Sequence, residues 1–321
     1  MSAPAMRIDC SIVIPVYYNE GLLVNTLRQI CERVIAANPN RKFEVVFVDD
    51  GSGDGSLREL LELREKNPGL VKVVKLSRNF GQVPAIRCGY ENAVGACAVA
   101  MSADGQDPSE LINEMLRAHF EENCEIVIAA RQGRDESAYR VWTSAIFYRI
   151  MQKLCFPKMP AGGFDFTLMG RRALQVFLAQ REAQAFYQGQ ILWMGFKTKL
   201  LEYRRLERKI GQSRWTFGKK LTYLIDGVVS YSFFPIRLVS VLGMITALAG
   251  FLYALVVLIV RLTVGTPVQG WAPLMIVLLV LGGLQMITLG IFGEYLWRIF
   301  AQVQNRAPYI VDQVYDRSDE A

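Results

Sequence analysis

Residues 42–56 read KFEVVFVDDGSGDGS, and this stretch decides the fold class. Its first part is a largely apolar run rich in β-branched residues, which is typical of a strand buried on both faces of a sheet. The run ends in two acids, Asp49 and Asp50, followed by a glycine-rich loop. A buried strand that opens into a polar loop is expected at the binding edge of a parallel sheet.

The same pattern recurs on both sides of this stretch. Further strands are predicted at residues 10–16, 71–77, 96–108 and 124–131, ranges that include the polar residues at the end of a strand. Apolar residues at helical spacing separate them, at residues 17–37, 56–67, 84–95 and 109–123. Strands that alternate with helices predict a doubly wound α/β fold with a mostly parallel sheet.

Polar side chains gather at the carboxyl ends of these predicted strands. They are Asp49, Asp50, Arg78, Asn79, Asp104, Gln106 and Arg131. Sheets of this class bind ligands at the edge where the carboxyl ends of their strands meet. We therefore expect these residues to contribute to one site.

The stretch SADGQDPSE, residues 102–110, is the candidate metal site. Mg²⁺ often takes one or two oxygen ligands from a protein and the rest from water and substrate phosphates. Asp104 and the amide oxygen of Gln106 can therefore suffice if a diphosphate supplies further oxygens. Ser102 would be an outer neighbour, and we expect the metal to bind weakly without nucleotide.

The glycine-rich loop after Asp49 and Asp50 is not a P-loop, because no Gly-Lys-Ser/Thr follows it. We expect these two carboxylates to accept hydrogen bonds from a base or a ribose. The alternative is that either one only caps a turn.

Composition indicates a soluble domain followed by a few membrane spans. The chain has 321 residues, of which 52% are hydrophobic, and a mean hydropathy of +0.21. Residues 238–260 and 274–292 contain no charged residue. Each is close to the roughly 20 residues that cross a hydrocarbon core. The six Cys form no Cys-x-x-Cys pair, which argues against zinc and fits a reducing compartment.

The charge distribution sets the expected orientation. A net charge of +6 suits an anionic partner, whether a nucleic acid, a phosphorylated substrate or an acidic lipid surface. Cations flank the predicted spans on the side away from their connector, at Arg204, Arg205, Arg208, Lys209, Arg214, Lys219, Lys220, Arg237, Arg298 and Arg306. The positive-inside rule then puts both termini and the α/β domain in the cytoplasm, at the inner membrane.

Several motifs, in order along nearly the whole chain, carry a family resemblance. They are IPVYYNE (14–20), VDDGSGDGS (48–56), LSRNFGQ (76–82), SADGQDPSEL (102–111), FDFTLMGRRAL (164–174) and RKIGQSRW (208–215). The chain resembles family 2 glycosyltransferases of the GT-A fold. Within that family it is similar to the polyprenyl-phosphate enzymes, namely dolichol-phosphate mannose synthase and the bactoprenol glucosyltransferases with two C-terminal spans.

The resemblance implies a division of the chain into parts. Residues 1–215 would be a cytoplasmic catalytic domain, 216–236 amphipathic interfacial helices, 237–300 two transmembrane helices and 301–321 a cytoplasmic tail. Residues 312–321 are polar, and we expect them to be mobile. The amphipathic residues 136–156 fit either an ordinary core-facing helix or an interfacial one.

The resemblance also implies site residues. A nucleotide-sugar pocket would be formed by Pro15, Tyr17, Glu20, Asp49, Asp50, Ser102, Ala103 and Asp104. The PVYYNE motif has one residue more than the commoner PVYNE of the family, so either Tyr17 or Tyr18 could fill the aromatic position. Mg²⁺ or Mn²⁺ would bind Asp104 and Gln106, and Ser102 stands where the family usually has a carboxylate that contacts the nucleotide.

The acceptor phosphate would be bound by Arg131, Arg208, Ser213 and Arg214. Arg214 stands for a family Lys, and Arg adds a planar fork that suits phosphate. Asp104, Arg131, Arg208 and Arg214 would then be the catalytic residues. A lipid phosphate oxygen is already a competent nucleophile, so no strong general base is required of a chain with a single His.

The implied reaction is the inverting transfer of one sugar from a nucleotide sugar to undecaprenyl phosphate. UDP-glucose is the first expectation for the donor, with GDP-mannose or an amino-sugar donor as alternatives. The implied partners are these two substrates, the membrane and further copies of the chain, with a tetramer as the family expectation; nucleic acid is not expected.

Two other functions compete with this one. A processive polysaccharide synthase would carry Gln-x-x-Arg-Trp, but Gln212 and Arg214 are one residue too close. A membrane-anchored, non-catalytic partner would explain Ser102 as a decayed motif, although most of the expected site residues are present.

Overall fold

The structure is a computed structural model that describes residues 8–131, 148–160, 162–182, 186–203, 226–264 and 271–316. These residues belong to two compact units. The first lies within Met1–Lys219 and Ala307–Ala321, and the second within Lys220–Arg306. The chain thus leaves the first unit once and returns to it.

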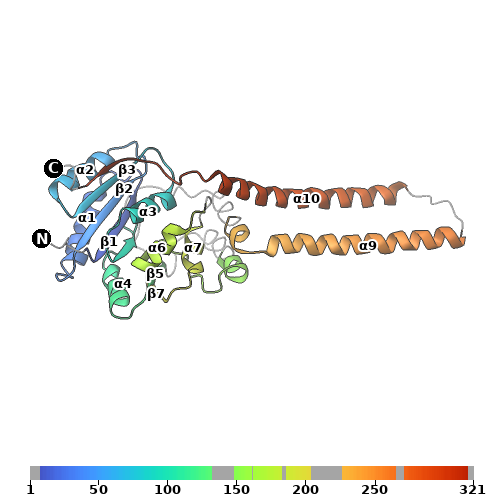
Figure 1. Ribbon diagram of the computed structural model, residues 1–321, viewed down its shortest axis with the longest axis horizontal. Helices are drawn as coiled ribbons and strands as arrows, with labels where there is room; N and C mark the ends of the chain where they lie inside the picture. The colour runs from blue at the N-terminus through green and yellow to red at the C-terminus, as the bar shows by residue number, and fades with distance from the viewer. Residues whose placement is uncertain are drawn as a thin grey trace. The chain divides into compact units, whose positions relative to one another are not determined.

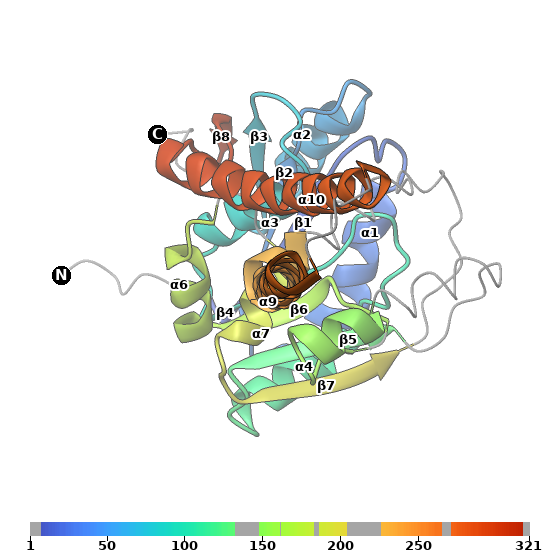
Figure 2. The same cartoon turned by 90° about the vertical axis from the view of Figure 1, so that its right-hand side faces the viewer.

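The first unit is built on an eight-stranded sheet with the order β7-β5-β6-β4-β1-β2-β3-β8. Its strands are β1 (Cys10–Val16), β2 (Phe43–Asp49), β3 (Val71–Leu76), β4 (Cys97–Ala100), β5 (Ile126–Arg131), β6 (Phe166–Gly170), β7 (Thr198–Tyr203) and β8 (Val311–Tyr315). In Figure 2 they follow one another from β8 at the top to β7 at the bottom. β6 and β8 run antiparallel to their neighbours, and every other pairing in the sheet is parallel.

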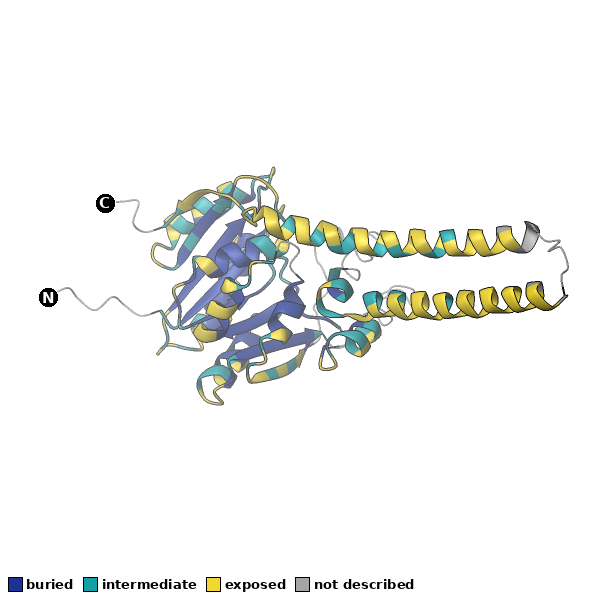
Figure 3. Ribbon diagram, turned by 45° about the vertical axis from the view of Figure 1, so that its right-hand side comes forward, coloured by how far each residue is buried: buried dark blue, intermediate teal, exposed yellow. Residues whose placement is uncertain are grey.

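Two layers of helices cover the two faces of the sheet, as the predicted α/β class requires. One face packs on α1 (Leu23–Ile30), α2 (Ser56–Lys66) and α4 (Leu111–Phe120). The other packs on α3 (Gln82–Glu91), α6 (Arg171–Ala179) and α7 (Tyr187–Trp193). The π-helical turn Cys31–Ile35 continues α1. Strands β1, β2 and β4 between these layers are almost wholly buried, which explains their continuous apolar runs (Figure 3).

The five predicted strands are present, but β6 and β7 were not predicted. β6 lies between β4 and β5 and is antiparallel to both. Its first residues therefore lie at the same edge of the sheet as the last residues of β4 and β5. This arrangement adds the residues that precede β6 to the predicted binding edge.

The prediction of a mobile polar tail at residues 312–321 is wrong for residues 312–315. They belong to β8, which pairs with β3 along the edge of the sheet. Side-chain contacts reinforce the pairing: Lys75 lies 2.6 Å from Asp312, and Lys72 lies 2.8 Å from Asp316. The hydroxyl of Tyr309 also donates to Glu91 of α3. The tail forms a strand because these local partners and the open edge of β3 offset its polarity.

The second unit contains two long apolar helices, α9 (Phe234–Val264) and α10 (Trp271–Gln304) (Figure 1). Within them, Phe234–Val260 and Ile276–Gln304 are long and apolar enough to cross a membrane, in agreement with the two predicted spans. Near the end of α10, Arg298 lies 2.7 Å from both Glu294 and Asp226. Of the predicted interfacial segment 216–236, residues 216–225 lie outside the described residues, residues 226–231 are helical, and α9 begins at Phe234.

Candidate active site

The candidate site is the edge of the sheet where the parallel strands end. β2 ends at Asp49, β5 ends at Arg131 and β7 ends at Tyr203. The loop Ser102–Asp107 follows β4, and Asp165 directly precedes the antiparallel β6. Strand order alone therefore assembles carboxylates, an amide and a guanidinium at one edge.

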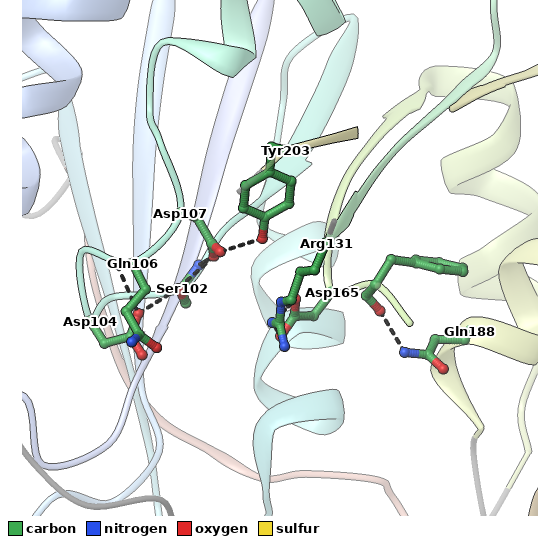
Figure 4. A network of polar contacts seen from close by, with 9 residues as sticks. Ser102, Asp104, Gln106, Asp107, Arg131, Asp165, Gln188 and Tyr203 are labelled. Carbon is green, nitrogen blue, oxygen red and sulfur yellow. Dashed lines mark hydrogen bonds and ion pairs between the residues drawn. The ribbon is translucent and has the colours of Figure 1, made fainter. Parts of the chain in front are cut away.

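A hydrogen-bonded network organises the loop after β4 (Figure 4). Asp107 is 1% exposed, and its Oδ2 accepts from the backbone N–H of Ser102 at 3.1 Å. Ser102 Oγ lies 2.5 Å from the same oxygen and 2.8 Å from Asp104 Oδ1. Because a serine hydroxyl carries one proton, it cannot donate fully to both carboxylates. The two carboxylates therefore share this single donor.

This loop fits a hard divalent cation. Asp104 and Asp107 bring two carboxylates together around one shared hydroxyl, and a cation would relieve the remaining negative charge. Gly105 has a φ of +68°, and a Cβ built there would meet no atom of the described residues within 4 Å, so the turn faces open space. Among the described residues no cluster of three or more His, Cys, Asp or Glu could hold a metal. Asp104 and Gln106 alone offer few oxygens, so a cation held here would need most of its ligands from a bound diphosphate or water.

Asp49 and Asp50 lie next to each other but in different surroundings. Asp49 Oδ1 accepts from the N–H of Ser52 at 3.3 Å, which is the predicted turn-capping contact. Its Oδ2 is buried and has no hydrogen-bond partner among the described residues. Burial raises the pKa of Asp49. An unpaired buried carboxylate oxygen is costly, but Asp49 is 0% exposed, so a donor from a ligand would have to reach it below the surface of the loop.

Asp50 holds the turn before α3. Its two carboxylate oxygens accept from the N–H groups of Phe80 at 2.7 Å and Gly81 at 2.9 Å. Burial raises the pKa of Asp50 to about 6, although these two N–H groups act in the opposite direction. Asp50 therefore supports the loop after β3, and a ligand would have to share its oxygens with that loop.

The loops after β2 and β3 are in close contact. Gly51 has a φ of +68°, and a Cβ there would lie 2.5 Å from the carbonyl carbon of Arg78. Only glycine permits both the conformation and the approach. The loops after β2 and β3, which border the expected nucleotide site, are therefore held against each other.

The aromatic residues after β1 border this pair of loops. Pro15 lies within β1, and the rings of Tyr17 and Tyr18 pack edge to face at 4.7 Å. The Tyr18 hydroxyl lies against Gly53, and Tyr17 is 36% exposed. These contacts do not distinguish Tyr17 from Tyr18, and both stay candidates for the predicted aromatic position.

Glu20 and Ala103 have structural contacts in addition to their predicted roles. Glu20 Oε2 accepts from the N–H of Gly55 at 2.9 Å, so it supports the start of α2. Ala103 is buried, and its carbonyl accepts from Thr26 at 3.2 Å.

Arg131 is paired across the end of β5. Its Nη2 lies 2.5 Å and 2.6 Å from the two carboxylate oxygens of Asp165. Burial alone would lower the pKa of Arg131, but Asp165, together with Tyr203 and Asp107, outweighs this effect and raises it. Arg131 is therefore a permanent cation whose charge is largely balanced by Asp165. The remaining predicted acceptor residues, Arg208, Ser213 and Arg214, lie outside the described residues.

Three residues of this edge were not predicted as site residues, namely Asp107, Asp165 and Tyr203. Asp107 and Asp165 fall within motifs that carried the family resemblance, which is the signal that could have found them. Tyr203 ends a strand that was not predicted. Its hydroxyl donates to Asp107 Oδ1 at 2.6 Å.

Comparison with known proteins identifies the family. The model of glycosyl transferase family 2 matches residues 11–178, slightly more than half of the 321-residue chain. The chain belongs to glycosyltransferase family 2. It is therefore a glycosyltransferase, and the described sheet agrees with the predicted GT-A class.

Relatives of this family 2 chain match it over nearly its whole length. An uncharacterized glycosyltransferase of Synechocystis sp. is 33% identical, over 97% of this chain and 96% of its own length. The SfII prophage-derived bactoprenol glucosyl transferase of Shigella flexneri is 32% identical, over 94% of this chain and 96% of its own length. Both matches extend through the two apolar helices.

Similarity to solved structures is looser. The mannosyltransferase PcManGT from Pyrobaculum calidifontis, in complex with GDP-Man and Mn²⁺, has a TM-score of 0.49 and 19% identity, over 70% of this chain and 64% of its own. The family assignment therefore rests on the sequence matches.

Proposed function

We propose that this family 2 enzyme transfers one sugar from a nucleotide sugar to a polyprenyl phosphate at the cytoplasmic face of the inner membrane. The observation that carries the proposal is the 32% identity with a bactoprenol glucosyl transferase over 94% of the chain. That match includes both the polar edge of the sheet and the two apolar helices. By this relationship, UDP-glucose is the first donor to test.

The course of the chain supports a membrane hairpin. β7 precedes the second unit and β8 follows it, yet both strands belong to the same sheet. A sheet cannot be divided by a bilayer, so the chain must cross the membrane an even number of times between them. Two spans, α9 and α10, satisfy this requirement, and the positive-inside rule orients the sheet toward the cytoplasm.

The donor would lie along the loops after β1, β2 and β4. Asp49, with its unpaired buried oxygen, would accept from the ribose or base, and Tyr17 or Tyr18 would stack on the base. Asp104 and Gln106 would hold Mg²⁺ or Mn²⁺, which when bound neutralises charge on the leaving nucleoside diphosphate. Ser102 would keep Asp104 and Asp107 in place.

The acceptor phosphate would approach from the side of β5 and β7. Arg131 lies there, but Asp165 already balances its charge. We therefore assign most of the attraction for the phosphate to Arg208 and Arg214, with Ser213 as a further donor and Arg131 orienting the phosphate. The only His of the chain, His119, contacts the carbonyl of Cys124 near the end of α4, which agrees with a reaction that needs no histidine base.

In-line attack by a phosphate oxygen would invert the configuration at the anomeric carbon. An α-linked donor would give a β-linked lipid-phosphate sugar. The product therefore reports on the mechanism as well as on the activity.

The proposal is tested with the full chain in membranes or nanodiscs. Labelled UDP-glucose, GDP-mannose and UDP-N-acetylglucosamine are each supplied with Mg²⁺ and undecaprenyl phosphate, and the product is extracted into organic solvent. One β-linked sugar per lipid is the expected result. A long polymer would support a processive synthase, and no transfer from any donor would support a non-catalytic partner.

A further inference from the structure

Tyr203 links two parts of the candidate site that lie on strands not adjacent in the sheet. It is the last residue of β7, and two strands, β5 and β6, lie between β7 and β4. Three strand spacings amount to roughly 14 Å. The Tyr203 hydroxyl nevertheless donates to Asp107, in the loop after β4, at 2.6 Å. The loop must therefore fold over the edge of the sheet toward β7.

The contact is buried and its direction is fixed. Tyr203 is 6% exposed and its ring packs edge to face on Phe166 at 6.1 Å. Burial, followed by the nearby Asp107 carboxylate, raises the pKa of Tyr203, so its hydroxyl keeps its proton at neutral pH. Asp107 is therefore the acceptor, and Tyr203 is a constant donor to it.

Through Asp107, this contact also restrains the loop Ser102–Asp107, which carries the expected cation ligands and is called the cation loop below. Oδ1 accepts from Tyr203, whereas Oδ2 accepts from the backbone and the hydroxyl of Ser102 (Figure 4). Ser102 in turn contacts Asp104, the expected cation ligand. On the other side, Tyr203 is the register partner of Arg131 in the pairing of β7 with β5. One hydroxyl thus fixes the cation loop relative to the strand end that carries Arg131.

We propose that Tyr203 is a positioning residue, which holds Asp107 and thereby sets Asp104 in the geometry that binds a divalent cation with a nucleoside diphosphate. The inference rests on the cation-dependent sugar transfer proposed above. We assign Tyr203 no direct contact with either substrate. Its effect reaches the cation through Asp107 and Ser102.

The test removes only the hydroxyl, in Tyr203→Phe. Tyr187→Phe is a matched control, because Tyr187 is also buried and its hydroxyl bonds Thr167 at 2.6 Å in the core. Mn²⁺ affinity in the presence of saturating UDP is measured by electron paramagnetic resonance on the full chain in detergent micelles. Thermal melting of each variant reports on folding.

We expect Tyr203→Phe to bind Mn²⁺ about tenfold more weakly, because the variant lacks one hydrogen bond to a buried carboxylate. Tyr187→Phe should bind Mn²⁺ like the wild type even if it melts earlier. Unchanged affinity in Tyr203→Phe overturns the inference, and so does an equal loss in both variants. The latter would mean that Tyr203 acts through general stability.

A second variant covers the case in which Tyr203→Phe does not fold. Asp107→Asn keeps the volume of the side chain but turns one acceptor oxygen into a donor, so either Tyr203 or Ser102 loses its acceptor. It should show the same loss of Mn²⁺ affinity, and wild-type affinity would overturn the inference.

The outcomes separate this inference from the proposed function. A wild-type chain that binds no Mn²⁺ with UDP or GDP contradicts both. A wild-type chain that binds Mn²⁺ and a Tyr203→Phe variant that binds it equally contradict the inference alone. Loss of Mn²⁺ affinity in Tyr203→Phe supports the inference even if no lipid acceptor is used, because the affinity measurement contains none.

Discussion

Ser102 Oγ lies 2.8 Å from Asp104 Oδ1 in the loop after β4. A serine therefore contacts the expected cation ligand at the position where the resembled enzymes usually carry a carboxylate. A serine hydroxyl is neutral and gives one proton, whereas a carboxylate would have added a third negative charge beside Asp104 and Asp107. We therefore expect Asp104 to matter far more for sugar transfer than Ser102.

Asp104→Ala should lower sugar transfer at least about 100-fold, because a bound divalent ion contributes several kcal/mol to stabilising the leaving group. Ser102→Ala should lower it less than about tenfold, since it removes one neutral donor. Initial rates with saturating lipid acceptor measure both effects. Equal losses in the two variants would overturn this account of the loop.

The pair Arg131–Asp165 should matter for stability far more than a comparable surface pair. Asp165→Ala would leave a mostly buried guanidinium without its counter-charge, which typically costs about 3 kcal/mol or more. Glu122→Ala removes the partner of Lys199 in a more exposed pair and should cost less than about 1 kcal/mol. Thermal melting of the full chain in detergent ranks the two variants. The interpretation fails if Asp165→Ala melts no earlier than Glu122→Ala.

The returning strand β8 should stabilise the first unit. A chain that ends at Arg306 lacks β8, so the edge of β3 loses its ladder of hydrogen bonds, each worth roughly 1 kcal/mol. We expect a lower melting temperature and aggregation through the exposed edge in size-exclusion chromatography. A chain that ends at Asp316 keeps β8 and is the control. Identical melting of the two truncated chains would show that β8 contributes no stability.

Asp50 should make stability depend on pH in a defined direction. Its pKa is raised from 3.8 to about 6, mainly by burial, so the folded chain holds this proton more tightly than the unfolded chain. The contribution of Asp50 to the free energy of unfolding therefore falls as the pH rises from about 4 to about 6, by at most ~3 kcal/mol, and is constant above that range.

Asp50→Asn isolates this effect because the amide does not titrate. The melting temperature of the wild type minus that of the variant should decrease from pH 4 to pH 6 and then level off. A difference that is independent of pH, or that increases over this range, would contradict the burial of the Asp50 charge.

The parts of the fold that could be predicted are those with a strong local pattern. β1, β2 and β4 are buried on both faces, so their continuous apolar runs identify them. β6 has five residues, and its place between β4 and β5 depends on pairing with distant segments. β8 carries Asp312 and Gln313 and is mostly exposed, so the local pattern indicated a tail. Its strand conformation comes from the distant edge of β3.

The same distinction applies to the site. The rule that ligands bind where parallel strands end placed Asp49, Asp104 and Arg131 at one edge, and the strand order agrees. Their roles remain predictions. Asp165 could not be placed by that rule, because it precedes an antiparallel strand that was not recognised. The link between Tyr203 and Asp107 depends on how one loop folds across two strands, which no local pattern describes.

The most direct test is to locate the cation. Crystals of the full chain grown with UDP and Mn²⁺ would be measured at a wavelength where manganese scatters anomalously. We predict a single strong anomalous peak bonded to a carboxylate oxygen of Asp104, with oxygens of the UDP diphosphate completing its coordination. A well-ordered Mn²⁺ that contacts the nucleotide but not Asp104 would contradict the proposed chemistry.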